Sequence, residues 1–169
     1  MSAEILNQTH LAHNTCFGCG HENPHGLHIR IFRDEENPER LRGVLHPKTH
    51  MTGFPGITHG GLLYTALDCM GAWVPKMLRP GSQALWLLRT ATLTYHKPAF
   101  PERDIQLLGW IESEGSAKEA MTVHVEARDE SGVLLADGAF KVIPVPLDKF
   151  QKITGIASIP ENWQDFFKL

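Results

Sequence analysis

Apolar side chains recur at helical spacing between residues 60 and 77, in the middle of the chain. The positions that follow this i, i+3/4, i+7 rhythm are Leu63, Ala66, Leu67, Met70, Val74 and Met77. The helix is expected to begin at the Gly-Gly pair 60–61 and to end soon after Pro75. Because Asp68 is the only charge between residues 59 and 74, the helix is apolar on all sides, which predicts burial inside a core.

Alternation of apolar and polar residues predicts strands on both sides of this helix. Residues 27–32 and 40–46 form the first two strands, and the acidic loop between them makes a hairpin. Four more strands follow the helix, at residues 85–96, 105–112, 120–128 and 133–143. Short polar links at 113–116 and 129–132 are typical of hairpins, so we expect an antiparallel sheet.

The segments outside these elements carry weaker patterns. The first 15 residues hold one or two helical turns, residues 47–58 form a loop rich in Gly and Pro, and the tail after residue 143 predicts irregular chain with a short terminal helix. Only a sheet curling around the central helix can bury it, so the element order predicts an α+β fold. A length of 169 residues favours a single domain.

Asp68 is the residue of this helix whose side chain is the candidate for a catalytic role. No Lys or Arg lies three or four positions from it, so a partner must come from elsewhere in the fold or from a ligand. A buried carboxylate without a partner usually has a shifted pKa, a network of donors or a functional role. A structural Asp at a strand or subunit boundary is the alternative. Gly60 and Gly61 favour a functional role, because glycines let backbone N–H groups at a helix start approach a charged oxygen.

Composition narrows the functional classes. A net charge of -3 with interspersed signs gives no basic stripe, which argues against a nucleic-acid partner. No apolar run approaches the roughly 20 residues of a membrane span. The polar start at residues 1–4 lacks the pattern of a signal peptide. We therefore expect a cytoplasmic protein without a membrane partner.

The three cysteines, Cys16, Cys19 and Cys69, cannot all pair within one chain and suit a reducing compartment. Histidines at positions 21, 25 and 28 follow the first two cysteines, and thiolate and imidazole are the usual ligands of zinc. A structural zinc site normally combines two separated ligand pairs, however, and the sequence has no second CxxC pair. The pattern therefore favours a tight turn with two reduced thiols over a metal site.

Three motifs carry the most specific signal in the chain. They are Cys16-Phe17-Gly18-Cys19-Gly20 with Asn23-Pro24-His25-Gly26-Leu27, then Pro55-Gly56-Ile57-Thr58-His59-Gly60-Gly61 followed by Asp68 and Gly71-Ala72-Trp73, and finally Tyr95-His96-Lys97-Pro98-Ala99. This set resembles the PaaI-like acyl-CoA thioesterases of the hotdog fold, in which a curved antiparallel sheet wraps a central helix. The resemblance implies one domain over residues 1–169, with an amino-terminal extension (1–26), a hotdog core (27–145) and a tail (146–169).

The resemblance also implies a reaction, the hydrolysis of acyl-CoA thioesters, with coenzyme A as part of the substrate and no separate cofactor. Asp68 would be the general base or the nucleophile, the Gly60 N–H the oxyanion donor, and His59 the residue that orients the thioester carbonyl or the loop. Relatives are dimers or larger, so Asp68 of one chain would act beside Gly60 of another in a homodimer or homotetramer. Because Asp68 must be ionised, activity is expected to fall at acid pH.

Further substrate contacts are expected around these groups. The residues assigned to substrate binding are Gly61, Thr65, Arg89, Thr90 and Lys97. Thr90 or Arg89 would approach Asp68 from the next strand. The candidate contacts to the phosphates of coenzyme A are Lys97, Arg103 and Arg89. Tyr64, Trp73 and Trp86 either line an acyl pocket or pack in the core.

One departure and two alternatives stay open. Some relatives carry an Asn six positions before the HGG histidine that helps to place water, and here that position is Gly53. Hotdog hydratases and dehydratases also place an acid in the central helix but pair it with a catalytic His, and the segment from His50 to Pro55 resembles such a loop. A non-catalytic acyl-CoA-binding module, in which Asp68 is structural, is the second alternative.

Overall fold

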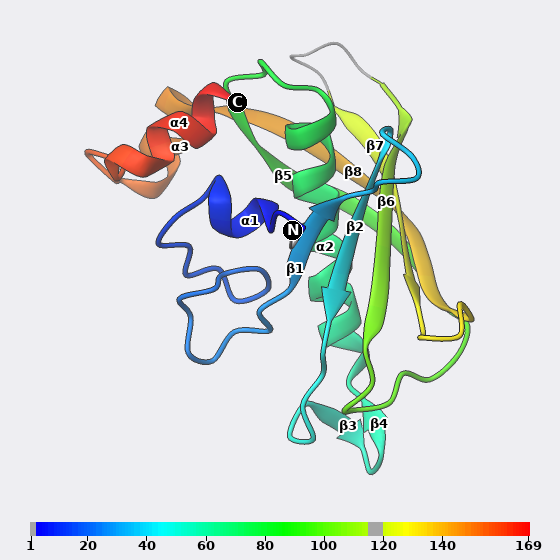
Figure 1. Cartoon of the computed structure of the whole chain (residues 1–169). Coiled ribbons are helices and arrows are strands. Elements are labelled where there is room, and N and C mark those ends of the chain that lie inside the picture. Colours follow the sequence, from blue (N-terminus) through cyan, green and yellow to red (C-terminus); the bar gives the residue numbers. More distant parts are fainter. Residues whose placement is uncertain (1–2, 115–119) are drawn as a thin grey trace.

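A six-stranded antiparallel sheet curves around one long helix in the computed structural model, which describes residues 3–114 and 120–169 (Figure 1). The helix, α2, spans Gly60–Leu78. In spatial order the strands are β1 (Arg30–Arg33), β2 (Arg40–Leu45), β6 (Ile105–Ser113), β7 (Met121–Arg128), β8 (Leu134–Pro146) and β5 (Ala84–Tyr95). The predicted α+β order of two strands, a helix and four strands is confirmed.

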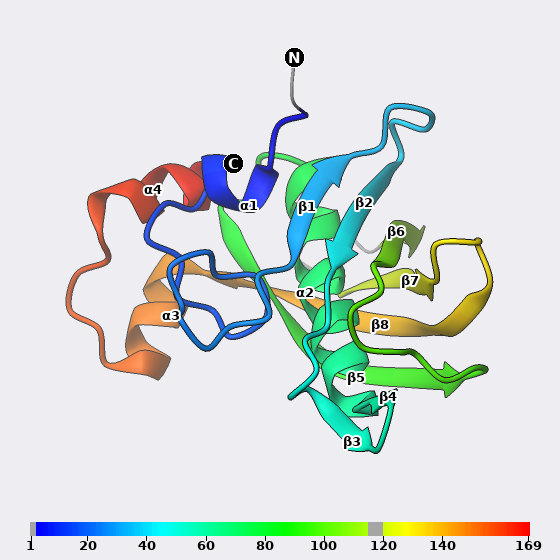
Figure 2. The same ribbon diagram turned by 60° about the horizontal axis from the view of Figure 1, so that its bottom comes forward.

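Strand β5 lies at one edge of the sheet, although it directly follows α2 in the sequence. It pairs only with β8, and its other edge has no strand neighbour among the described residues. A bulge between Leu88 and Thr90 shifts its register. A strand of twelve residues therefore leaves one row of backbone N–H and C=O groups open for pairing (Figure 2).

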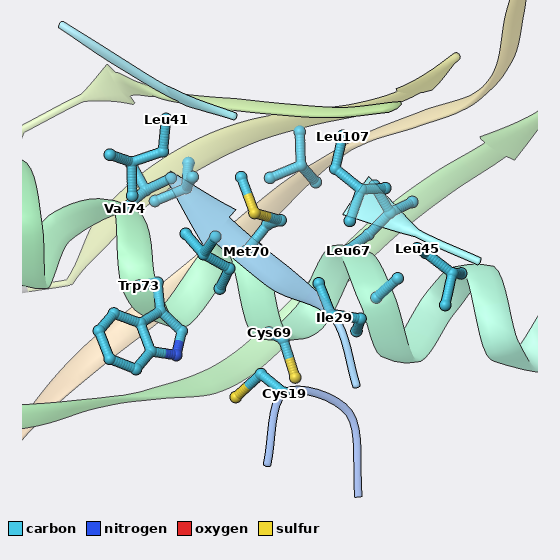
Figure 3. Packing of buried hydrophobic residues seen from close by; sticks show 14 of the residues in the cluster. Cys19, Ile29, Leu41, Leu45, Leu67, Cys69, Met70, Trp73, Val74 and Leu107 are labelled. Carbon is cyan, nitrogen blue, oxygen red and sulfur yellow. The ribbon is translucent and has the colours of Figure 1, made fainter. Parts of the chain in front are cut away.

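Helix α2 packs on the concave face of the sheet through Leu67, Met70 and Val74, which are fully buried (Figure 3). Gly43 and Gly109 stand on the strands opposite. A Cβ on these glycines would lie 2.9 Å from Met70 Sδ and 2.7 Å from Val74 Cγ2, respectively. Glycine at both positions therefore lets helix and sheet approach closely, and the apolar rhythm of the sequence corresponds to the helix face that the sheet covers.

The opposite face of α2 is open in a single chain, contrary to the prediction of a helix buried on all sides. Gly61 and Tyr64 are exposed, and Thr65, Asp68 and Ala72 are only partly buried. The prediction was wrong because it rested on the scarcity of charge. Small and hydroxyl-bearing residues tolerate partial exposure, so they do not report which side of the helix faces the sheet.

The short elements agree only in part with the sequence. Helix α1 (Leu6–Thr9) matches the predicted turn near the amino terminus. The predicted loop over residues 47–58 instead contains a small hairpin, β3 (Thr52–Phe54) and β4 (Ile57–Thr58). Its breaker-rich composition concealed strands of only two or three residues.

The tail contains two helices, α3 (Leu147–Thr154) and α4 (Glu161–Lys168), where only a terminal one was expected. The predicted link at 129–132 joins β7 to β8, and the other link, at 113–116, extends into residues outside the described part of the chain. Among the helices described, none has both the length and the apolar character needed to cross a membrane.

Candidate active site

The first turn of α2 presents one free backbone donor. His59 caps the helix, and its Nδ1 accepts the Gly61 N–H over 2.9 Å. The hydroxyl of Tyr95, at the end of β5, donates to the Gly60 carbonyl over 2.9 Å. The Gly60 N–H has no acceptor among the described residues. The positive end of the helix dipole and one N–H thus face outward at this point.

A cavity of about 440 Å³ opens beside this donor. Its walls are the β3–β4 hairpin, the start of α2 and the segment from Tyr95 to Ala99, which brings Lys97 to the rim. Phe54, on the hairpin, is 76% exposed, so part of this wall is apolar and open. An anionic or polarised oxygen can therefore enter next to the Gly60 N–H.

Asp68 lies two turns further along α2 and is half-buried. Burial, and after it the negative charge of neighbouring Cys16, raise the pKa of this carboxyl group above its ordinary value. Within the described part of the chain no hydrogen bond or ion pair reaches Asp68. It lines a second cavity, of about 410 Å³, together with Trp73 and Trp86. The acid therefore faces a cavity rather than closed packing.

The two groups do not meet in a single chain. Gly60 and Asp68 line different cavities. Eight residues of helix separate them, which is about 12 Å at 1.5 Å per residue. The acid and the free N–H would need a second copy of the chain to face one another.

The other predicted site residues divide into two groups. Thr65 lies on the open face of α2, where its hydroxyl donates to the Gly61 carbonyl over 2.9 Å. Trp73 and Trp86 line the Asp68 cavity and also belong to the buried core, so the position of each fits both alternatives. Arg89 and Thr90 are exposed at the β5 bulge and contribute to neither of the two cavities described above, so the approach to Asp68 expected of them is absent within one chain.

The presence of glycine at position 53, where some relatives would carry Asn, has a steric explanation. A Cβ there would lie 3.1 Å from His59 Cδ2, so the ring of His59 fills the space that a side chain at position 53 would need. His50 and His59 line a third cavity, of about 680 Å³, which does not include Asp68. Within the described residues, Asp68 therefore shares no cavity with either histidine, as the acid of a hydratase would.

Two features of the site were missed in the sequence. Tyr95 was placed by its strand alternation and in the motif that begins at it, but nothing in either pattern links it to Gly60. Cys69, which directly follows Asp68, joins Cys16 and Cys19 in a cluster whose Sγ atoms all lie within 4.8 Å of one another. Hydrogen bonds from the other two thiols lower the pKa of Cys16, whereas hydrogen bonding to them and burial raise that of Cys69.

No protein-family model and no curated protein matches the sequence. Solved structures do match. The PaaI protein of the phenylacetic acid degradation operon of E. coli is 17% identical, over 70% of this chain and 80% of its own, with a TM-score of 0.61. A Streptococcus mutans protein bound to acetyl-CoA is 15% identical, over 64% of this chain and 82% of its own, with a TM-score of 0.57.

A hypothetical thioesterase of Streptococcus pneumoniae, solved with coenzyme A, is 14% identical, over 70% of this chain and 86% of its own, with a TM-score of 0.59. At such identities a likeness establishes the fold. The predicted fold is confirmed, and this chain has the hotdog fold of PaaI and of related thioesterase-superfamily structures.

Proposed function

We propose that this protein hydrolyses acyl-coenzyme A thioesters. The observation that carries the proposal is the free Gly60 N–H at the start of α2, which opens on a cavity with Lys97 at its rim. The fold supports it, because the structures that share this fold include proteins named as thioesterases, one of them solved with coenzyme A, and a further protein solved with acetyl-CoA. Lys97 is suitably charged for the phosphates of the coenzyme.

Gly60 is assigned the role of oxyanion donor. A thioester carbonyl oxygen gains negative charge as its carbon is attacked, and a fixed N–H stabilises that charge most strongly in the transition state. One such donor contributes about 3 to 4 kcal/mol in comparable sites. His59 acts indirectly, because by accepting the Gly61 N–H it holds the first turn in place.

Asp68 is assigned the role of base or nucleophile. As a base, its carboxylate takes a proton from water, the hydroxide oxygen bonds to the thioester carbon, and the carbon–sulfur bond then breaks to release the coenzyme A thiolate. As a nucleophile, it bonds to that carbon itself, the carbon–sulfur bond breaks to release the coenzyme A thiolate, and water then hydrolyses the resulting anhydride to the free acid and Asp68. Both routes need an ionised Asp68 within reach of the substrate carbonyl.

The complete site is proposed to form between two copies of the chain. The open face of α2 and the free edge of β5 offer the surface: Tyr64, Leu87 and Tyr95 are all exposed in a single chain, at 36%, 41% and 51%. Pairing across this surface places Asp68 of one copy opposite Gly60 of the other. Gly61 and Thr65 then contribute to the shared wall, and Trp73 and Trp86 contact the acyl group.

The test is a panel of acyl-CoA thioesters with wild-type protein and Asp68→Asn, which keeps the shape of the side chain but removes its charge. Coenzyme A release should be followed by chromatography, because the three free cysteines would react with a thiol reagent. We expect kcat to fall by about 10²- to 10⁴-fold. Asp165→Asn, which changes an acid on α4 whose side chain is 82% exposed, is the matched control and should leave turnover unchanged.

Two results would contradict the proposal. Hydration of an enoyl-CoA without coenzyme A release indicates a hydratase. Saturable acyl-CoA binding without turnover, unaffected by Asp68→Asn, indicates a binding module.

A further inference from the structure

Three thiols converge from two distant segments of the chain. Cys16 and Cys19 belong to the loop before β1, and Cys69 projects from α2 toward that loop (Figure 3). The three Sγ atoms lie within 4.8 Å of one another, and those of Cys16 and Cys69 are 4.0 Å apart. The protein has no other cysteine. Its whole thiol content is therefore gathered at one point.

The loop is shaped to bring these thiols onto the helix. A Cβ on Gly18 would lie 2.3 Å from Cys69 Sγ, and a Cβ on Gly20 would lie 2.4 Å from backbone atoms of Cys16. The Gly20 N–H closes the turn on the Cys16 carbonyl over 2.9 Å. Glycine at position 18 therefore allows the loop to approach α2, and glycine at position 20 allows the turn to close on its own backbone.

Buried amides fix the loop from behind. Asn14, which is 2% exposed, accepts the Cys16 N–H at 2.9 Å, and its amide nitrogen lies 3.6 Å from Cys19 Sγ. Asn7, which is 1% exposed, donates to the Cys19 carbonyl over 2.6 Å and to the Ile29 carbonyl over 2.9 Å. An N–H group directed at a sulfur is a common companion of metal-bound thiolates. The thiols are thus held in place without a disulfide between them.

We propose that Cys16, Cys19 and Cys69 bind one Zn²⁺ ion. Zinc bonds thiolate sulfur at about 2.3 Å in tetrahedral geometry, which sets the sulfurs about 3.8 Å apart. The Sγ atoms of Cys16 and Cys69, 4.0 Å apart, are close to that value, and all three Sγ atoms lie within 4.8 Å of one another. A disulfide would join only two of the thiols and would leave the third without a partner. Zinc uses all three, and each thiol gives up its proton on binding.

The fourth position of the ion faces the cavity of about 410 Å³ that these cysteines line with Asp68. A water molecule there completes the coordination. The ion anchors the loop to α2 and so holds one wall of the Asp68 cavity in place. The zinc site does not depend on the proposed hydrolysis, because its three protein ligands belong to one chain.

The test measures metal directly. Full-length protein purified under reducing conditions without chelator should contain about one zinc per chain by elemental mass spectrometry. Replacement by Co²⁺ should give a thiolate charge-transfer band, and zinc should raise the thermal unfolding midpoint. An outer hydrogen-bond partner of a metal ligand already contributes about 10- to 100-fold in affinity, so Cys16→Ser should weaken zinc binding by at least that factor.

Cys16 is exposed, so Cys16→Ser is the variant least disturbing to the fold, and Cys69→Ser provides the second. His25→Ala is the matched control, because His25 lies in the same segment but lines a different cavity. It should keep its zinc. The proposal is overturned if reduced wild-type protein binds neither zinc nor cobalt, if both serine variants bind as tightly as wild type, or if His25→Ala loses the ion.

Discussion

The Tyr95 hydroxyl donates a hydrogen bond to the Gly60 carbonyl over 2.9 Å. This bond joins the last residue of the edge strand β5 to the first residue of α2. On the next residue, the Gly61 N–H is taken by His59. Two side chains thus position the helix start, while the free donor belongs to the backbone. The donor can therefore be tested only by a substitution that removes a backbone N–H.

Gly60→Pro should remove the oxyanion donor and keep the helix. Proline is well tolerated at the first position of a helix, and the preceding His59, with φ -62° and ψ 129°, has the conformation that a following proline requires. We expect kcat for acyl-CoA hydrolysis to fall by about 10²- to 10³-fold. Gly60→Ala retains the N–H and brings its Cβ 3.4 Å from the Tyr95 ring, so its loss should be much smaller. Equal losses in the two variants would rule out the donor role.

Subunit mixing tests the composite site. Asp68→Asn and Gly60→Pro chains should each be inactive as homodimers. After unfolding and refolding together, a mixed dimer contains one site with both Asp68 and Gly60 intact. Random association should restore roughly a quarter of wild-type turnover, since half of the dimers are mixed and each has one good site of two. No recovery, with mixed dimers confirmed by native mass spectrometry, would place both groups in one chain.

The ion pair between Asp34 and Arg40 should stabilise the first hairpin. The Asp34 carboxylate is buried and accepts from Arg40 and from the Glu36 N–H. Burial alone would raise its pKa, but these hydrogen bonds and charges hold the pKa below its ordinary value. Arg40→Met leaves the buried Asp34 carboxylate without its positively charged partner. The free energy of unfolding at pH 7, measured by urea denaturation, should therefore fall by about 3 kcal/mol.

The pH dependence of this pair has a defined sign. Because the folded pKa of Asp34 is depressed, its stabilisation is present above the unfolded pKa and is lost as pH falls through the folded value. The difference between wild type and Arg40→Met should shrink in that acid range. Arg30→Met, an exposed change on the neighbouring strand, should cost little at any pH.

Lys76 should make the free energy of unfolding increase as the pH rises above neutrality. Its side chain is buried, and its ammonium group donates to the carbonyls of Ala84 and Phe167. Burial lowers the pKa of Lys76 to about 8. Below pH 8 the folded protein holds a charged Lys76 in a buried place, which destabilises it. As the pH rises from 8 toward the unfolded pKa of about 10.4, Lys76 loses its proton in the folded state first, and the free energy of unfolding increases. Relative to Lys76→Met, wild type should gain up to about 3 kcal/mol between pH 7 and pH 10. A constant difference across that range would contradict the buried charge.

The core of the fold could be predicted from the spacing of apolar residues along the sequence alone. Leu67, Met70 and Val74 repeat at helical spacing, and residues Met121 to Ala127 alternate strictly, because each pattern follows the geometry of the surface it buries. The edge position of β5 was not predictable in this way. It depends on which strands pair, and the alternation of one strand does not name its neighbour.

The site was predictable only where its residues are close in sequence. His59, Gly60 and Gly61 form one turn, so their spacing reveals them. Cys69 lies 50 positions beyond Cys19, and only the folded chain brings their sulfurs together. The open face of α2 was misjudged for a related reason: Thr65 and Ala72 suit both a protein core and a surface between copies.

The loop from Asn14 to Gly20 has one more consequence. Residues 1–26 precede the first strand of the sheet and look like an appendage that could be trimmed. Yet Leu11, Asn14, Cys16 and Cys19 all line the cavity of Asp68, and Cys69 is its immediate neighbour along the helix. Shortening the protein to its core would expose the acid to bulk water while leaving every core residue unchanged.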